Sequence, residues 1–325
     1  MHRFISADWL RMRRFWLTWV LLVLLLVILT LQINGKLNEL ETWKAEVETG
    51  VSAYDGSPLS SLQIEGNRLL IRIRTAELSY PVFIGTVTYT ATGIGWFFII
   101  LFTVVFAGED FSRKTIPVIL TRGVTRRKYL IGRTLSLWFA TGAVLLIIAA
   151  LAAVFGPIIH RWVSEDPISL VKLGEALLWI VRSWLTYLPF IVIILFWVVV
   201  ARNMGPALGV GIGTHTLEYL YGLALPFFAT IYANVETRGG SAPWFYRIQI
   251  EVFSLTLGYN ADVFLNWGAP FAREAMFISG TLGLGGETLL PTSPWRGLTF
   301  MVSYTVVFLA WTMWLFQRRD VRCGG

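Results

Sequence analysis

The sequence is poor in cysteine and histidine. Among 325 residues there is one cysteine, Cys323, so no disulfide can form within the chain. The three histidines are His2, His160 and His215, and no His-Glu-x-x-His motif joins any two of them. We therefore expect no structural zinc and no catalytic metal, and we assign no catalytic residue.

Charged residues are also scarce. They make up 14% of the chain while hydrophobic residues make up 55%, whereas roughly a quarter of a soluble domain is charged. A lipid bilayer is therefore the expected solvent. The formal net charge of +7 does not indicate nucleic-acid binding, because the basic residues lie beside hydrophobic stretches, where they set the orientation of membrane spans.

The nucleotide-binding P-loop motif, Gly-x-x-x-x-Gly-Lys-Ser/Thr, does not occur in the sequence. The chain cannot hold nucleotide phosphates by that route. We expect no cofactor in this chain, and any ATP-driven activity would place ATP and Mg²⁺ on a separate subunit.

Long apolar stretches are what the sequence has in abundance. A helix needs about 20 apolar residues to cross a bilayer, and six stretches meet this requirement: 15–33, 82–107, 135–156, 176–201, 205–233 and 297–316. The first stretch is too long for a signal peptide and lacks a cleavage site, so it is interpreted as an uncleaved anchor. The sequence predicts an all-α polytopic membrane protein with about six transmembrane helices.

The distribution of Lys and Arg predicts the orientation of these spans. Fifteen of them fall in the N-terminal segment 1–14, the connection 108–134, the turn 202–204 and the tail 317–325. The alternate connections 34–81, 157–175 and 234–296 each hold more acidic than basic residues. Because basic residues resist translocation, we expect both termini in the cytoplasm and a multi-pass protein of the cytoplasmic membrane.

Two of the expected outer segments are long. In 34–81, the runs 62–65 and 68–75 flank Gly66-Asn67, a pattern that predicts a small external β-hairpin. Leu37, Leu40 and Val47 lie near helical spacing and would extend the first span outward. The segment 234–296 mixes aromatic residues with isolated charges and predicts short interfacial helices.

The connection 108–134, called here the basic connection, is the most informative segment. It begins with the acidic pair Glu109-Asp110, has Pro117 placed to open a short helix, and has Thr125 placed to cap the helix that leads into the third span. One interpretation is a solvated basic loop that only fixes topology. The order of its residues favours a functional role in addition to topology.

From residue 120 the sequence Leu-Thr-Arg-Gly-Val-Thr-Arg-Arg-Lys-Tyr-Leu follows the acidic pair and a Thr-Ile step, and this order resembles the membrane subunits of ABC-2 type transporters. The six spans, the cytoplasmic termini and the large outer segment before the last span are also similar to that family. Two features depart from it: Gly123 stands where the family often has Pro, and the outer segment 34–81 is larger than in compact members.

The resemblance implies the permease subunit of an ABC exporter, which works with a separate ATP-binding cassette ATPase and with a second permease copy or homologue. It also implies that the basic connection contains a coupling helix that docks on the ATPase. The residues implied in that contact are Glu109, Asp110, Phe111, Arg113, Lys114, Thr115, Ile116, Ile119 and Arg122. An integral membrane enzyme and a structural membrane subunit without transport activity remain as alternative functions.

The fifth predicted span carries a glycine repeat and two ionisable residues. Gly205, Gly209 and Gly213 recur at every fourth residue and predict close packing of another helix, either within the chain or across a dimer. His215 and Glu218 lie one turn apart, and ionisable groups in a membrane span indicate a functional site. They either line a pathway or form a buried polar cluster, in which Arg182 of the fourth span is a further candidate partner.

Overall fold

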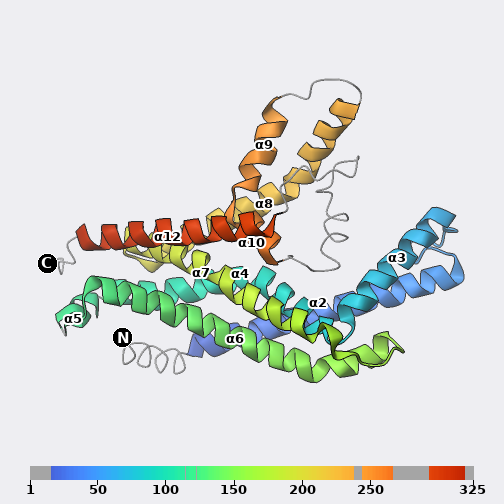
Figure 1. Cartoon of the computed structure of the whole chain (residues 1–325), viewed down its shortest axis with the longest axis horizontal. Helices are drawn as coiled ribbons and strands as arrows, with labels where there is room; N and C mark the ends of the chain where they lie inside the picture. The colour runs from blue at the N-terminus through green and yellow to red at the C-terminus, as the bar shows by residue number, and fades with distance from the viewer. Residues whose placement is uncertain (1–15, 114, 122, 238–243, 266–292, 319–325) are drawn as a thin grey trace. The chain divides into compact units, whose positions relative to one another are not determined.

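The computed structural model describes residues 16–113, 115–121, 123–237, 244–265 and 293–318, and it is helical over most of this length (Figure 1). Inside the described helices, the side chains at 17, 219, 222, 223, 225–237, 245–247, 250 and 253 are outside the description. A bilayer offers no water to unpaired backbone groups, so a chain this apolar satisfies them within helices. The protein is an all-α polytopic membrane protein, as predicted.

In the described part of the chain, five helices are long and apolar enough to cross a membrane. They are α2 (Trp16–Thr49), α4 (Val82–Ser112), α6 (Arg126–Val163), α7 (Leu173–Ala201) and α12 (Pro294–Arg318). Each contains one of the predicted spans, except that residue 15 of the first span lies outside the described residues. The remaining predicted span, 205–233, lies within the continuous helix α8 (Met204–Thr237), and its crossing of the membrane stays a prediction.

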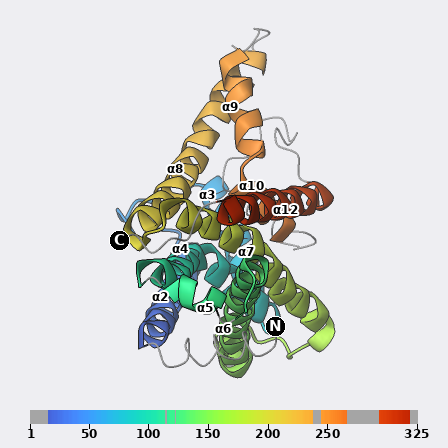
Figure 2. The same cartoon turned by 90° about the vertical axis from the view of Figure 1, so that its left-hand side faces the viewer.

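The chain divides into two compact units, whose segments can be found by residue number with the colour bars of Figures 1 and 2. In the described residues, the first unit comprises Trp96–Thr141 and the chain from Trp184 onward. The second unit comprises Trp16–Gly95 and Gly142–Ser183.

In the second unit, the segment predicted to form a β-hairpin is a helix, so that prediction was wrong. α3 (Ser61–Leu78) packs beside the later part of α2 (Figure 1). Its start is fixed by a capping box, in which the Gln63 amide donates to Ser60 Oγ (3.3 Å) and the Ser60 amide donates to Gln63 Oε1 (2.9 Å). Asn67, read as a turn residue, instead donates from Nδ2 to Glu46 Oε2 of α2 at 2.8 Å.

The predicted helical continuation of the first span is confirmed, because α2 continues to Thr49, and its place outside the membrane stays a prediction. Ion pairs between α2 and α3 fix how the two helices align. Lys36 Nζ lies 3.2 Å from Glu77 Oε2, and Arg74 Nη2 lies 2.6 Å from Glu39 Oε2. Such partly exposed ion pairs each contribute little stability. Their main effect is to specify how α3 aligns along α2.

Threonines at the start of α4 satisfy their hydroxyls on helix backbone. Thr88, Thr90 and Thr92 donate to the carbonyls four residues earlier at 2.7–2.8 Å, as expected for threonine in an apolar helix. Thr86 instead donates to the Glu77 carbonyl at 3.0 Å and so joins α4 to the end of α3.

In the first unit, α9 (Trp244–Ser254) runs back along α8, and α10 (Leu257–Leu265) packs against α12 (Figure 1). The Tyr221 hydroxyl of α8 donates to the Gln249 carbonyl of α9 at 2.8 Å. Where the segment 234–296 is described it thus contains short helices, as predicted, and their position at the membrane interface stays a prediction. Residues 238–243 and 266–292 lie outside the described residues.

Candidate functional site: the basic connection and the polar residues of α8

The basic connection folds as a short helix between two long ones. α4 ends at Ser112, α5 spans Thr115–Thr121 with Pro117 in its first turn, and α6 begins at Arg126. Thr125 caps α6 as predicted, because the Lys128 amide donates to its Oγ1 at 3.3 Å. Gly123 has a φ of 82°, which favours glycine and which proline cannot adopt, so the α5–α6 turn explains why glycine stands where the resemblance led us to expect proline.

Apolar side chains hold α5 against three other helices of the first unit. Ile116 of α5 is buried in a cluster with Tyr129 and Leu130 of α6, Val199 of α7 and Phe316 of α12. Phe111, Ile119, Leu120 and Val124 pack on this cluster from its edge. The rings of Phe111 and Phe316 meet edge to face at 6.0 Å. A shift of α5 must therefore disturb α6, α7 and α12.

A buried ion pair joins the end of α4 to the start of α6. Asp110 Oδ2 binds the Arg133 guanidinium, and each side chain is only 1% exposed. The Tyr129 hydroxyl donates to the same oxygen at 2.7 Å, while Thr115 Oγ1 of α5 donates to Oδ1 at 3.3 Å. Because desolvation offsets much of the attraction in such a pair, its main effect is to fix the relative placement of α4, α5 and α6.

Arg126 connects the same region to the end of α12. Its Nη1 atom donates to the carbonyls of Phe316 (3.1 Å) and Gln317 (2.7 Å). The last carbonyls of a helix have no partner within it, and a cation there also complements the helix dipole. The start of α6 therefore caps the last turn of α12.

The polar residues of α8 contact neighbours far away in the sequence. The His215 ring stacks on the indole of Trp96 in α4, with the ring centres 5.4 Å apart. Glu218 Oε1 accepts a hydrogen bond of 2.6 Å from the amide of Gly258, the second residue of α10. Arg182 belongs to the second unit, so its proposed pairing with Glu218 stays a prediction.

Comparison with known protein families decides what kind of membrane protein carries these features. The sequence model described as "ABC-2 family transporter protein" matches residues 6–321, almost the whole chain. The chain belongs to the ABC-2 transporter family. No curated protein and no solved structure matched it in the other two comparisons. Membership implies an ABC transporter permease.

For this ABC-2 protein, the structure separates the predicted coupling residues into buried and exposed ones. Asp110, Glu109 and Ile116 are buried, and Phe111, Thr115 and Ile119 are partly buried, whereas Arg113 is 70% exposed. Lys114 and Arg122 lie outside the described residues. The buried residues therefore position α5 rather than forming its outer surface.

The outer surface of the basic connection includes residues that the sequence interpretation missed: Val118, Thr121, Arg127 and Lys128. Val118, at 53% exposure, stands on the side of α5 away from Ile116. The helical period could have indicated this, since residues two apart in a helix point in nearly opposite directions.

Among the described residues, two glycines of the repeat in the ABC-2 protein have no close neighbour. A Cβ atom at Gly209 or Gly213 would meet no described atom within 4 Å. Gly211, which lies off the repeat, is the close contact: a Cβ there would lie 3.0 Å from Ile100 of α4 and 3.0 Å from Ile194 of α7. The alternative of a second copy against Gly205, Gly209 and Gly213 stays a prediction.

Gly211→Leu is expected to destabilise the chain by about 1–3 kcal/mol, because the added side chain must displace α4 or α7. Gly209→Leu is the matched control within the same helix and is expected to leave the melting temperature in detergent unchanged. Thermal unfolding followed by tryptophan fluorescence measures both. If Gly209→Leu instead lowers dimer formation in size-exclusion light scattering, the repeat contacts a second copy; equal melting losses for both variants would contradict the assignment of Gly211.

Within the residues that the structure describes, no group of three or more His, Cys, Asp or Glu side chains is placed to hold a metal ion. His160 is buried in the second unit, where Nδ1 accepts from the Tyr80 amide at 3.4 Å and Nε2 lies 2.9 Å from the Asp166 carbonyl oxygen. Its two ring nitrogens thus serve local backbone contacts.

Proposed function

We propose that this chain is the permease subunit of an ATP-driven exporter in the cytoplasmic membrane. A separate ATP-binding cassette ATPase would hydrolyse ATP, and a second permease copy or homologue would complete the pore. Family membership and the apolar helices support this proposal. The substrate is not assigned.

The observation that supports the proposal most strongly is the way α5 packs against the long helices around it. This short helix lies between α4 and α6 and packs on α12, while the buried pair Asp110–Arg133 fixes its surroundings. A force on the outer face of α5 would therefore pass to several long helices at once. A small rigid helix held in this way is suited to receive motion from a partner.

The exposed surface predicts the chemistry of that partner. Val118 offers one apolar side chain, and the exposed cations Arg113, Arg127 and Lys128 lie before and after it in the same connection. Interfaces commonly combine an apolar centre with a charged rim that steers association. We expect the ATPase to present an apolar pocket with acidic residues around it.

Val118→Asp is expected to reduce the amount of ATPase that co-purifies with the chain by about tenfold or more, because a charge would replace the apolar contact at the centre of the interface. The ATPase is first identified as a protein with a nucleotide-binding P-loop motif that co-purifies with the wild-type chain. Val171→Asp is the matched control, since Val171 is 89% exposed and lies in the second unit. Both variants should insert and melt like the wild type.

Reversing the rim with Arg127→Glu and Lys128→Glu should weaken binding further and reduce its dependence on salt. If Val118→Asp and the rim variant both retain full ATPase binding and ATP hydrolysis, α5 is not the docking element. The basic connection would then serve only to fix topology.

A further inference from the structure

α12 is held at both ends by contacts with other parts of the first unit. At its C-terminal end, Phe316 lies in the apolar cluster under α5, and Arg126 binds the last carbonyls. At the other end, α12 binds the turn that joins α9 to α10. Arg296 Nη2 donates to Ser254 Oγ at 2.9 Å, and the Tyr304 hydroxyl donates to the Leu255 carbonyl at 3.0 Å.

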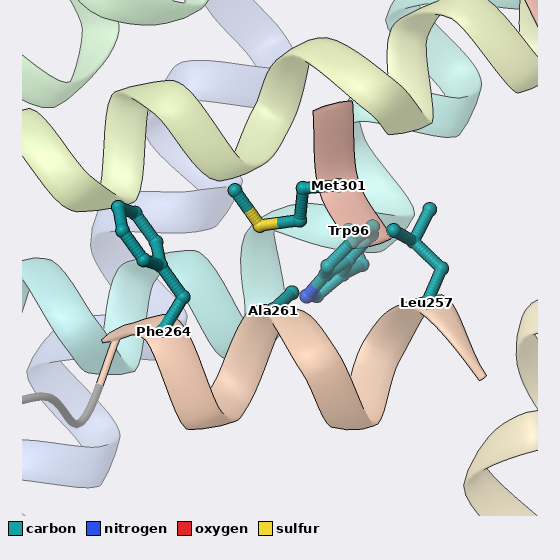
Figure 3. Packing of buried hydrophobic residues seen from close by; sticks show 5 residues of the cluster. All are labelled: Trp96, Leu257, Ala261, Phe264 and Met301. Atoms are coloured by element: carbon teal, nitrogen blue, oxygen red, sulfur yellow. The ribbon is translucent and has the colours of Figure 1, made fainter. Parts of the chain in front are cut away.

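The backbones of α10 and α12 approach closely. A Cβ atom on Gly297 of α12 would lie 2.5 Å from the Asn260 carbonyl oxygen of α10, so only glycine permits this contact. Leu257, Ala261 and Phe264 lie on one side of α10 and point toward Met301 of α12 and Trp96 of α4 (Figure 3). With polar and apolar contacts on the same pair of helices, α10 cannot shift without moving α12.

Glu218 attaches α8 to this assembly. Its carboxylate accepts the Gly258 amide in the first turn of α10, where unpaired amides and the helix dipole favour a negative charge. A Cβ atom on Gly258 would lie 2.7 Å from Glu218 Oε1, so the contact also depends on glycine at 258. A charge-assisted bond of this kind is among the stronger hydrogen bonds in proteins.

We propose that Glu218 is a positioning residue that ties α8 to α10, and that α12 transmits the state of this tie to the basic connection. From Gly297 to Phe316 the helix covers about 28 Å at 1.5 Å per residue. Coupling between two sites is reciprocal, so a change at either end of α12 must be felt at the other. The contacts of Glu218 and α12 lie within this chain and do not depend on the proposed function. Only their role in transport rests on it.

The tie is tested by hydrogen–deuterium exchange on the full chain in phosphatidylcholine nanodiscs, without ATPase. Glu218→Leu removes the acceptor and Gly258→Ala pushes it away, so each is expected to lower the protection of the Gly258 amide about tenfold. Glu218→Gln keeps an acceptor oxygen and should restore most of the protection. Gly174→Ala is the matched control: Gly174 is also the second residue of its helix, α7, and a Cβ there would meet no described atom within 4 Å.

Transmission is tested on the same samples by the exchange of amides in α5 and the first turns of α6. Glu218→Leu is expected to change their protection by about threefold, and Arg126→Ala is expected to lower protection at Gly258 in return. An unchanged Gly258 amide in Glu218→Leu would overturn the tie. If the Gly258 amide loses protection while the amides of α5 and α6 keep theirs, transmission through α12 is overturned. Neither result depends on ATPase binding, so a failure here is distinct from a failure of the proposed docking.

Discussion

Arg133→Ala is expected to lower the free energy of unfolding by about 3–5 kcal/mol, because it removes the buried guanidinium that binds the Asp110 carboxylate. Both side chains are almost fully removed from solvent, so water cannot take over the role of the guanidinium. The bonds from Tyr129 and Thr115 remain but carry no positive charge. Unfolding in detergent, followed by tryptophan fluorescence during denaturant titration, measures the loss.

The neighbouring pair Glu109–Arg113 supplies the control. Its N–O distance is 2.7 Å, but Arg113 is mostly exposed, so Arg113→Ala is expected to cost less than about 1 kcal/mol. The double variant Asp110→Leu, Arg133→Met removes both charges and should be more stable than Arg133→Ala alone. A double variant as unstable as the single one would show that lost packing, and not an unpaired charge, causes the effect.

Phe316→Ala is expected to be comparably destabilising, by about 3–5 kcal/mol, because the ring is buried and its removal leaves a cavity. The cavity would open beneath α5, where Phe111 and Tyr129 both pack on this ring. We therefore expect trypsin to cut the basic connection faster, since its Lys and Arg residues become more accessible when α5 loosens. Gel analysis of timed digests measures the rate.

Phe97→Ala serves as the matched control, because Phe97 is an exposed phenylalanine of α4 in the same unit. It should change neither stability nor the cleavage rate by a comparable amount. Should Phe316→Ala melt early while the basic connection is cut at the wild-type rate, the end of α12 does not support α5, and the route proposed through α12 fails with it.

The spans could be predicted from sequence because a run of about 20 apolar residues is needed to cross a bilayer, whatever the packing. The ends of the helices could not. Apolarity marks only the part of a helix that lies in lipid. The spacing of Leu37, Leu40 and Val47 predicted that α2 continues beyond its apolar stretch, but it did not predict the end at Thr49. The Thr125 cap was predictable because capping depends only on residues adjacent in sequence.

The segment predicted to be a β-hairpin contains two competing local patterns, one typical of a turn and one typical of a helix start. Gly66-Asn67 resembles a hairpin turn, but Ser60 and Gln63 already had the spacing of a capping box. The contact from Asn67 to Glu46 then places the polar amide against α2 within the helix. Pairing with a neighbouring helix overrode the turn preference, as tertiary contacts commonly do.

The candidate site was predictable in location but not in detail. The charges of the basic connection indicated its place, yet the burial of Asp110 depends on Arg133 and Tyr129 reaching it from another helix. The partner of Glu218 is a backbone amide of Gly258, and a backbone donor leaves no mark in the sequence. Contacts between distant segments decided both outcomes.

The contact between Arg126 and the last turn of α12 also has a consequence for the order in which the protein folds during synthesis. Ribosomes synthesise the chain from its N-terminus, so Phe111, Ile116 and Tyr129 are translated long before Phe316, which completes their cluster. Until α12 has been inserted, Arg126 lacks the carbonyls that it binds in the finished chain, and the underside of α5 remains open. A chain in which α12 has not yet been made therefore cannot present a finished α5, and any partner that docks on this surface would have to wait for that helix.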